Sequence, residues 1–288
     1  MLRLFTDTDT DFCPSLAAEY GYKLISMPYS IEAKTTYPYV DFETFDAHAF
    51  YDTLRGGVLP TTSAISKEQY LGYFEEDFKA GNDILYVHFS RVMTNTFDAM
   101  DQAIAELKEK YPRVRFEEID TKGITTISYA IVREVGDLVK AGKTLDVVLE
   151  WAKTEVDKFA MYFFADDLKF FRRSGRVSGL KAAMGTLIGV RPLIHMSQEG
   201  KMVSVGTAKG RLNAMMALVD KVGELGDEIE KHRICIGHTD APEIAKEIGK
   251  MIENKFGKQN IVYVDVNPTA GSHCGPNGVG VCFQAIHR

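Results

Sequence analysis

The chain has 288 residues and few cysteines, and none of them is spaced as zinc ligands usually are. Its four cysteines, Cys13, Cys235, Cys274 and Cys282, form no C-x-x-C pair, so we expect free thiols and no metal site. No apolar run approaches the ~18 residues that a membrane span needs. The N-terminus turns acidic after five residues and has no signal-peptide core. We therefore expect a cytoplasmic protein without an integral membrane segment.

Excess positive charge is also missing, since the net charge is −6, and this disfavours a broad nucleic-acid surface. The sequence has no G-x-S-x-G elbow, no H-E-x-x-H and no P-loop. Asp7, Asp9 and Asp11 resemble calcium ligands, but Phe12 stands where a calcium loop needs glycine. Capping of the next helix by Asp11 is the interpretation we favour. No cofactor and no catalytic residue are predicted.

The first part of the chain alternates between strand and helix patterns, which predicts an α/β fold with a parallel sheet covered by helices. The length fits two domains, and we place the N-terminal one at residues 1–158. Its expected strands are residues 2–5, 24–29, 83–89 and 115–119. Its expected helices are residues 14–20, 42–54, 67–79, 96–111, 127–141 and 145–158.

Residues 159–288 predict a smaller C-terminal α/β domain with a mixed or antiparallel sheet, because strand patterns flank the tight turn Glu199-Gly200. A long helix is expected at residues 211–230, and another begins near Asp240 with Pro242 in its first turn. The expected strands are residues 161–164, 190–196, 201–205, 234–237, 261–266 and 281–285.

Small polar residues gather in two segments that precede helices. Thr61, Thr62 and Ser63 form one segment, and the other contains Thr94 and Asn95. Hydroxyls in such places cap helices, or they donate to an anionic ligand with help from the helix N-terminus. Because ligands of open α/β sheets bind beyond the carboxyl ends of strands, two such loops could form one anion cradle.

Two further segments carry cationic or imidazole groups. Arg172, Arg173 and Arg176 form a basic turn, which either stays solvated or binds carboxylate or phosphate, and Asp166 and Asp167 could pair with it. In the other, His273 lies in a run of glycines that we expect to be a loop. Its imidazole has either a structural role or donates to a carboxylate.

These motifs together resemble the DegV family of bacterial fatty-acid-binding proteins over essentially the whole chain. The resemblance rests on TDT-x-x-D at Thr6–Asp11, PTTS at Pro60–Ser63, the FxxDDLxxxxRxGRxS region that ends at Ser178, and GxHxGP near the C-terminus. It implies a long-chain fatty acid buried between two α/β domains, with its carboxylate held by hydroxyls and a histidine.

In this sequence, the resemblance implies that the carboxylate of the fatty acid is bound by Thr62, Ser63, Thr94 and His273. Further candidate head-group contacts are Thr61, Asn95, Gly271 and Ser272. It also implies that the carrier presents its lipid to a fatty acid kinase, with Arg173 and Arg176 facing the partner or the phosphate.

The chain departs from the family pattern at four places. Where the family usually has SS-x-LSGT, Arg91 and Asn95 interrupt the motif in Ser90–Thr96, although Thr94 keeps a hydroxyl at the expected serine. Ser174 and Asn277 replace two usual glycines. Two other hypotheses stay open at this point. One is a hydrolase or acyltransferase in which His273 activates Ser63 or Thr94, and the other is a small-molecule sensor that binds no lipid.

Overall fold

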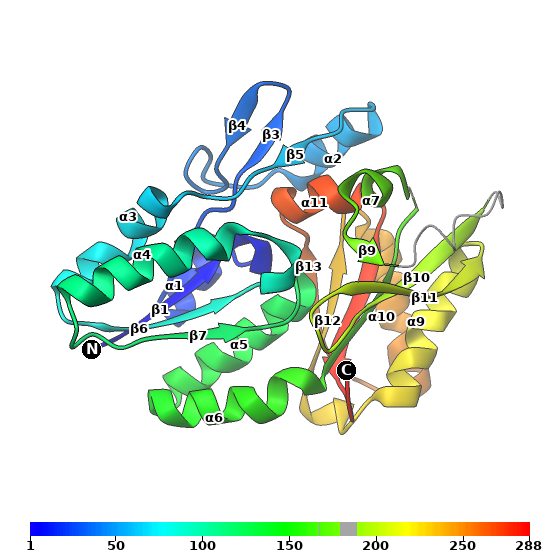
Figure 1. Ribbon diagram of the computed structural model, residues 1–288. Helices are drawn as coiled ribbons and strands as arrows, with labels where there is room; N and C mark the ends of the chain where they lie inside the picture. The colour runs from blue at the N-terminus through cyan, green and yellow to red at the C-terminus, as the bar shows by residue number, and fades with distance from the viewer. Residues whose placement is uncertain (167, 179–188) are drawn as a thin grey trace.

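Figure 1 shows the computed structural model of the protein, which describes residues 1–166, 168–178 and 189–288. The strands form three sheets: a parallel sheet, a small antiparallel sheet and a larger mixed sheet. Both larger sheets carry helices, so the α/β fold class predicted from the sequence is confirmed.

The parallel sheet has four strands in the order β2-β1-β6-β7, and all three pairings are parallel. This confirms the sheet that the strand and helix alternation predicted. The bounds of its strands are β1 (Leu2–Asp7), β2 (Tyr22–Ile25), β6 (Asp83–His88) and β7 (Phe116–Asp120). The helices of this part are α1 (Pro14–Tyr20), α3 (Lys67–Lys79), α4 (Thr96–Lys110), α5 (Thr126–Lys140) and α6 (Leu145–Glu155).

Helices cover both faces of the parallel sheet. The two faces can be told apart because successive side chains of a strand point to opposite sides. On β1, Phe5 packs in a buried cluster with Phe74 of α3 and Phe97 of α4. Its neighbour Leu4 belongs to another cluster, which contains Ile131 of α5. Helices α3 and α4 therefore lie on one face, and α5 lies on the other.

The small sheet, in the order β4-β3-β5, corrects one predicted strand. Residues 24–29 were expected to be one strand, but β2 ends at Ile25, and β3 (Tyr29–Ile31) begins after Pro28, which has no amide proton for a sheet. Its partners are β4 (Lys34–Thr36) and β5 (Thr61–Thr62). The helix expected at 42–54 begins later, as α2 (Ala47–Arg55), because the Asp46 side chain accepts from the amide of Ala49 and caps it.

The mixed sheet has seven strands in the order β13-β12-β14-β8-β10-β11-β9. Strands β12 and β13 pair in parallel, as do β9 and β11, and the other pairings are antiparallel, so the predicted mixed sheet is confirmed. The strand bounds are β8 (Phe159–Phe164), β9 (Val177–Ser178), β10 (Val190–Met196), β11 (Met202–Lys209), β12 (Arg233–His238), β13 (Asn260–Asp265) and β14 (Val279–Gln284).

Four helices belong to the second half of the chain as the structure describes it: α7 (Leu168–Ser174), α9 (Arg211–Leu225), α10 (Pro242–Phe256) and α11 (Pro268–Cys274). The helix expected at 211–230 ends five residues early, at Leu225. Helices α9 and α10 share a buried cluster with the mixed sheet. Within the described residues, no helix combines the length and the apolar character needed to cross a membrane.

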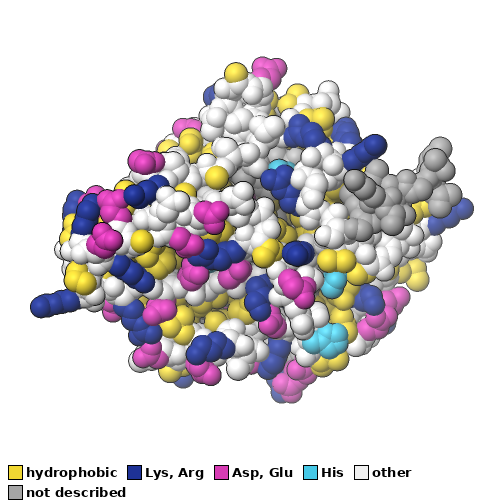
Figure 2. Space-filling view, in the orientation of Figure 1, with side chains coloured by type: hydrophobic (Ala, Val, Ile, Leu, Met, Phe, Trp, Pro, Cys, Tyr) yellow, Lys and Arg dark blue, Asp and Glu magenta, His cyan; other side chains and the backbone are white. Residues whose placement is uncertain are grey.

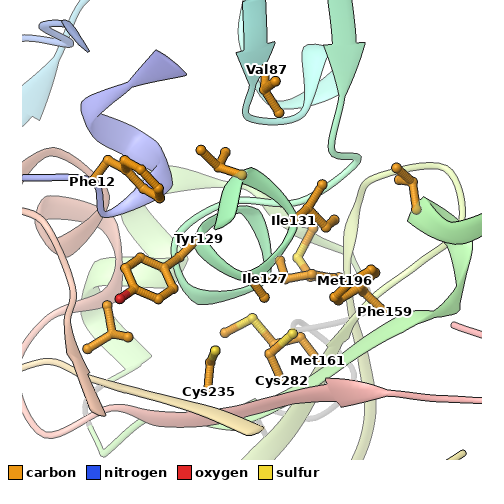
Figure 3. Close-up of a cluster of buried hydrophobic side chains, with 14 of the residues drawn as sticks. Phe12, Val87, Ile127, Tyr129, Ile131, Phe159, Met161, Met196, Cys235 and Cys282 are labelled. Atoms are coloured by element: carbon orange, nitrogen blue, oxygen red, sulfur yellow. The ribbon is translucent and has the colours of Figure 1, made fainter. Parts of the chain in front are cut away.

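Helix α5 lies between the two larger sheets, and Figure 3 shows its side chains in the middle of one cluster. Ile127 and Ile131 of α5 pack there together with Val87 of the parallel sheet and with Met161 and Cys282 of the mixed sheet. The residues on either side of position 158 thus share one core. A boundary between two domains at that position remains a prediction.

Candidate functional site

A cavity of about 390 Å³ lies between elements of the two halves of the chain. Its volume falls within the range of ~300–1,000 Å³ that is usual for ligand pockets. Much of the lining is apolar, contributed by Met27, Phe89, Met93, Met161, Phe163, Phe171, Met196 and Met202. Polar groups from several loops complete the lining. This combination suits a ligand with a long apolar part and a polar head.

His273 and Thr62 meet at the wall of this cavity. His273 Nε2 and Thr62 Oγ1 share a hydrogen bond of 2.8 Å, although the two residues are 211 positions apart. Burial, with smaller contributions from Arg176 and Arg173, lowers the pKa of His273 to about 4. The imidazole is therefore neutral at pH 7, with one nitrogen that donates and one that accepts.

The segment around His273 is a short helix, α11, and not the loop expected from its glycines. Pro268 occupies the first turn, and the Asn267 side chain accepts from the amide of Ala270, 2.9 Å away, so the helix is capped. His273 lies in its last turn. The glycines led us to expect a loop, although Asn267 and Pro268 just before them are typical of the start of a helix.

Gly271 and Ser272 of α11 have structural contacts and do not line the cavity. A Cβ atom at Gly271 would lie 2.3 Å from the Tyr51 hydroxyl, so glycine allows α2 and α11 to approach each other. The Ser272 hydroxyl donates to the carbonyl of Pro268, 2.8 Å away, within the same helix. The geometry thus gives no support to these two candidate head-group contacts.

The hydroxyls of Thr61, Thr62 and Ser63 do not cap the following helix. Ser66 caps α3 in a reciprocal capping box with Gln69. Thr62 and Ser63 line the cavity, whereas Thr61 is exposed and does not. Pairing of β5 with β3 holds Thr62 opposite Tyr29.

Thr94 and Asn95 also line the cavity, just before α4. Thr94 Oγ1 accepts from the amide of Thr96 at 3.1 Å, so this hydroxyl has the capping role that its position indicated. Its proton stays available to donate to a ligand, because a hydroxyl donates one hydrogen bond besides those it accepts. Arg91 is engaged elsewhere, in ion pairs with Asp101 and Glu118.

The basic segment that we expected to be a turn is partly helical, because Arg172 and Arg173 lie in the last turn of α7 and Arg176 follows it. Lys and Arg side chains gather on the surface over α7 (Figure 2). We keep the name arginine turn for Arg172, Arg173 and Arg176. Arg176 lines the cavity and donates from Nη1 to the carbonyl of Ser174 at 2.6 Å. Arg173 does not line it, and its Nη1 donates to the carbonyl of Leu59. Arg173 and Arg176 both lie close enough to lower the pKa of His273.

The acidic partners expected for this turn are not found there. Asp166 pairs with Arg191 and Arg211, at 2.5 and 2.7 Å, so the predicted pairing with the arginine turn is wrong for this residue. Asp167 lies outside the described residues. Asn277 has the positive φ that we anticipated, 62°, and accepts a hydrogen bond from Arg55.

The acidic run near the N-terminus is buried. Asp11 does not cap α1, because its Oδ1 accepts from the backbone amide and the side-chain amide of Asn267, at 2.9 and 2.7 Å. Burial raises the pKa of Asp7 to about 7 and that of Asp11 to about 8. Asp9 lines the cavity, and so do Thr125 and Thr126, and the sequence analysis singled out none of the three as a cavity residue.

Comparisons with known proteins agree with this architecture. A model of the DegV family, described as uncharacterised proteins, matches residues 1–285. A DegV domain-containing protein of Clostridium perfringens is 28% identical, over 97% of this chain and 96% of the relative.

Two solved structures are similar over 99% of both chains. One is a fatty-acid-binding DegV family protein from Thermus thermophilus, with a TM-score of 0.86 at 20% identity. The other is the fatty acid kinase B3 protein of Streptococcus pneumoniae loaded with linoleic acid, with a TM-score of 0.82 at 16% identity. At these identities the likeness shows the fold. Because the family model covers nearly the whole chain, the protein belongs to the DegV family.

Proposed function

We propose that this protein binds one long-chain fatty acid in the cavity, with the carboxylate at Thr62, Ser63, Thr94 and His273. The observation that carries the proposal is the hydrogen-bonded pair of Thr62 and His273 in the wall of a largely apolar cavity. The fatty acids bound by proteins of the same fold support it.

The energetics favour an acyl ligand. Burial of methylene groups contributes about 0.8 kcal/mol each, so a sixteen-carbon chain gains roughly 10 kcal/mol before the costs of ordering it. A buried carboxylate needs hydrogen-bond donors, since a bare charge in such a place is very costly. Among the described residues the Thr94 hydroxyl accepts one hydrogen bond and donates none, so it can donate to the carboxylate. The hydrogen-bonded pair of Thr62 and His273 can supply a second proton, from the hydroxyl or from the ring according to the tautomer.

We further propose that the protein is a carrier which presents the carboxylate to a fatty acid kinase for conversion to an acyl phosphate. The Streptococcus pneumoniae kinase B3 protein supports this partner. Arg176 lines the cavity, Arg173 does not, and both residues are exposed, so a partner can reach two guanidinium groups beside the proposed head-group site. Guanidinium groups suit the recognition of phosphate.

Catalysis by a histidine-activated hydroxyl receives less support. Such a mechanism needs a third residue that orients the histidine. The hydrogen bond found for His273 is to Thr62, and among the described residues no carboxylate pairs with its ring. Neither Ser63 nor Thr94, the nucleophiles considered from the sequence, has a hydrogen bond to His273 among these residues.

Native mass spectrometry of the gently purified protein tests the proposal. We expect a mass increase that corresponds to one fatty acid per chain, and organic extraction should release that acid. Folded protein that carries no lipid, and that takes up no added fatty acid after delipidation, would contradict the proposed function. An assay of ester hydrolysis, with His273→Leu as the comparison, separates the carrier from a hydrolase.

A further inference from the structure

The cavity contains a second polar position besides the pair of Thr62 and His273. Asp9 and Thr126 both line it, and their side chains are buried, with 5% and 0% of their surface exposed. Asp9 Oδ1 and Thr126 Oγ1 have no hydrogen-bond partner among the described residues. Buried side-chain oxygens without a partner are rare in folded proteins, so each one indicates a missing ligand or water.

The backbone holds this second position rigidly. Asp9 belongs to a 3₁₀ turn, Thr8–Thr10, that follows β1, and its carbonyl accepts from the amide of Thr125 at 2.7 Å. Thr125 has φ 57° and ψ −131°, a strained conformation for a β-branched residue, and it leads directly into α5. A Cβ atom at Gly237 of β12 would lie 1.8 Å from Thr126 Oγ1, so this glycine makes room for the hydroxyl.

Other polar groups near this position are satisfied within the protein. The Thr269 hydroxyl donates to the carbonyl of Met27 at 2.7 Å. The Thr239 hydroxyl accepts from the amide of Gly278 at 2.7 Å. Both threonines line the cavity. Among the buried side-chain oxygens of its lining in the described part of the chain, Asp9 Oδ1 and Thr126 Oγ1 are therefore the ones that lack a partner.

From this arrangement we infer that the cavity has a subsite for a hydroxyl group on the acyl chain, formed by Asp9 and Thr126. The inference rests on the proposed function and names the class of ligand, a hydroxylated fatty acid. An unsubstituted alkyl chain offers no donor or acceptor to either side chain. A ligand hydroxyl donates to Asp9 Oδ1 and accepts from the Thr126 hydroxyl, so one group satisfies both.

The subsite works with either protonation state of Asp9. Burial, together with the charges of Asp7 and Asp11, raises the pKa of the Asp9 carboxyl. An ionised Asp9 accepts from the ligand hydroxyl, and a protonated one also has a proton to donate to it. A second carboxylate on the ligand fits less well at this position, because it would lie beside the Asp9 carboxyl, which Asp7 and Asp11 already repel.

Helix α11 indicates where along the acyl chain the hydroxyl lies. The backbone amide of Ala270 lies close enough to the Asp9 carboxyl to lower its pKa. Ala270 precedes His273 by three residues in α11. Residues three apart on a helix are about 5–6 Å from each other, so the subsite is near the head group. We therefore place the hydroxyl within the first few carbons from the carboxylate.

Binding assays with three eighteen-carbon acids test the inference: octadecanoic acid, 3-hydroxyoctadecanoic acid and 12-hydroxyoctadecanoic acid. Each acid is titrated into the delipidated full chain. For the unchanged protein we expect 3-hydroxyoctadecanoic acid to bind at least about tenfold more tightly than octadecanoic acid, as one satisfied pair of hydrogen bonds predicts. The 12-hydroxy acid should show no such preference.

Two variants connect a preference to the subsite. Thr126→Val keeps the side-chain volume and removes the hydroxyl, and Asp9→Leu removes the carboxyl. In both, the preference for the 3-hydroxy acid should disappear while octadecanoic acid binds as before or more tightly. Thermal unfolding checks the fold, and if Asp9→Leu does not fold, Thr126→Val carries the test alone.

The outcomes separate this inference from the proposed function. Equal affinities of the unchanged protein for all three acids overturn the subsite and leave fatty-acid binding intact. Equal weakening of all three acids in Thr126→Val also overturns it, because Thr126 would then serve the head group or the fold. A preference for the 12-hydroxy acid overturns the placement near the carboxylate. If none of the acids binds, the proposed function itself fails.

Discussion

The hydrogen bond between Thr62 and His273 can be tested by a double-mutant cycle on fatty-acid affinity. Thr62→Val preserves volume and removes the hydroxyl, and His273→Leu removes the imidazole. A hydrogen bond to a charged group contributes roughly 1.5–3 kcal/mol, so each single change should weaken hexadecanoate binding about ten- to 150-fold. The 2.8 Å contact means that each residue also positions the other, so the effects should not add.

We expect the double variant to bind little worse than either single variant, so the coupling energy should be close to the cost of one change, about 1.5–3 kcal/mol. Isothermal titration calorimetry at pH 7.5 measures the affinities, and thermal unfolding checks that all variants fold. Thr61→Val is the matched comparison, since Thr61 is the exposed neighbour in β5 and does not line the cavity. Additive losses, within about 0.5 kcal/mol, would refute the idea that the pair acts as one unit.

Three further predictions concern stability and partner contact. Burial raises the pKa of Asp7 to about 7, so the folded protein binds a proton at Asp7 more tightly than the unfolded chain does. The free energy of unfolding should therefore fall by ~3 kcal/mol between pH 5 and pH 8.5. In chemical unfolding curves, Asp7→Asn should reduce this dependence on pH. Gly275→Ala, with φ +71° and a Cβ 2.2 Å from the Phe170 ring, should destabilise the protein by about 1–3 kcal/mol in the same assay. Arg173→Ala should leave lipid affinity near normal and reduce kinase-coupled phosphorylation, whereas Arg176→Ala should reduce both, because Arg176 lines the cavity.

Each of these predictions has a contrary result. An Asp7→Asn variant with the same pH dependence as the unchanged protein would show that other groups control that fall. Gly21→Ala is the control for Gly275→Ala, because Gly21 has φ +76° but open space around its Cβ position; equal losses would mean that crowding against Phe170 contributes nothing. If Arg173→Ala and Arg176→Ala impair lipid binding equally, the whole turn belongs to the lipid pocket.

The sequence predicted the parallel sheet because strand patterns alternate with amphipathic helices, and it predicted the mixed sheet because strand patterns flank a tight turn. The prediction of secondary structure was wrong at two places where a single residue ends a strand or begins a helix. Pro28 interrupts the strand expected at 24–29, and Asn267 caps a helix within a run that reads as a glycine loop. Both signals were present in the sequence, but each was outweighed by the composition around it.

Long-range partners could not be predicted from local patterns. Asp166 is followed closely in the sequence by Arg172, Arg173 and Arg176, yet it pairs with Arg191 and Arg211, which the mixed sheet and α9 bring to it. From the sequence we favoured helix capping by Asp11 for the acidic run at Asp7, Asp9 and Asp11, because nothing local signals that α5 and α11 will bury it. Only the packing shows that Asp9 reaches the cavity.

The position of α5 has a consequence for how this chain can be divided. Its buried side chains pack against both larger sheets, so a cut after residue 158 would expose apolar surface on each fragment. The halves are therefore not interchangeable modules that could be expressed alone or recombined with halves of other proteins. A joint change of the residues facing α5 from both sides would be needed to exchange one half for another.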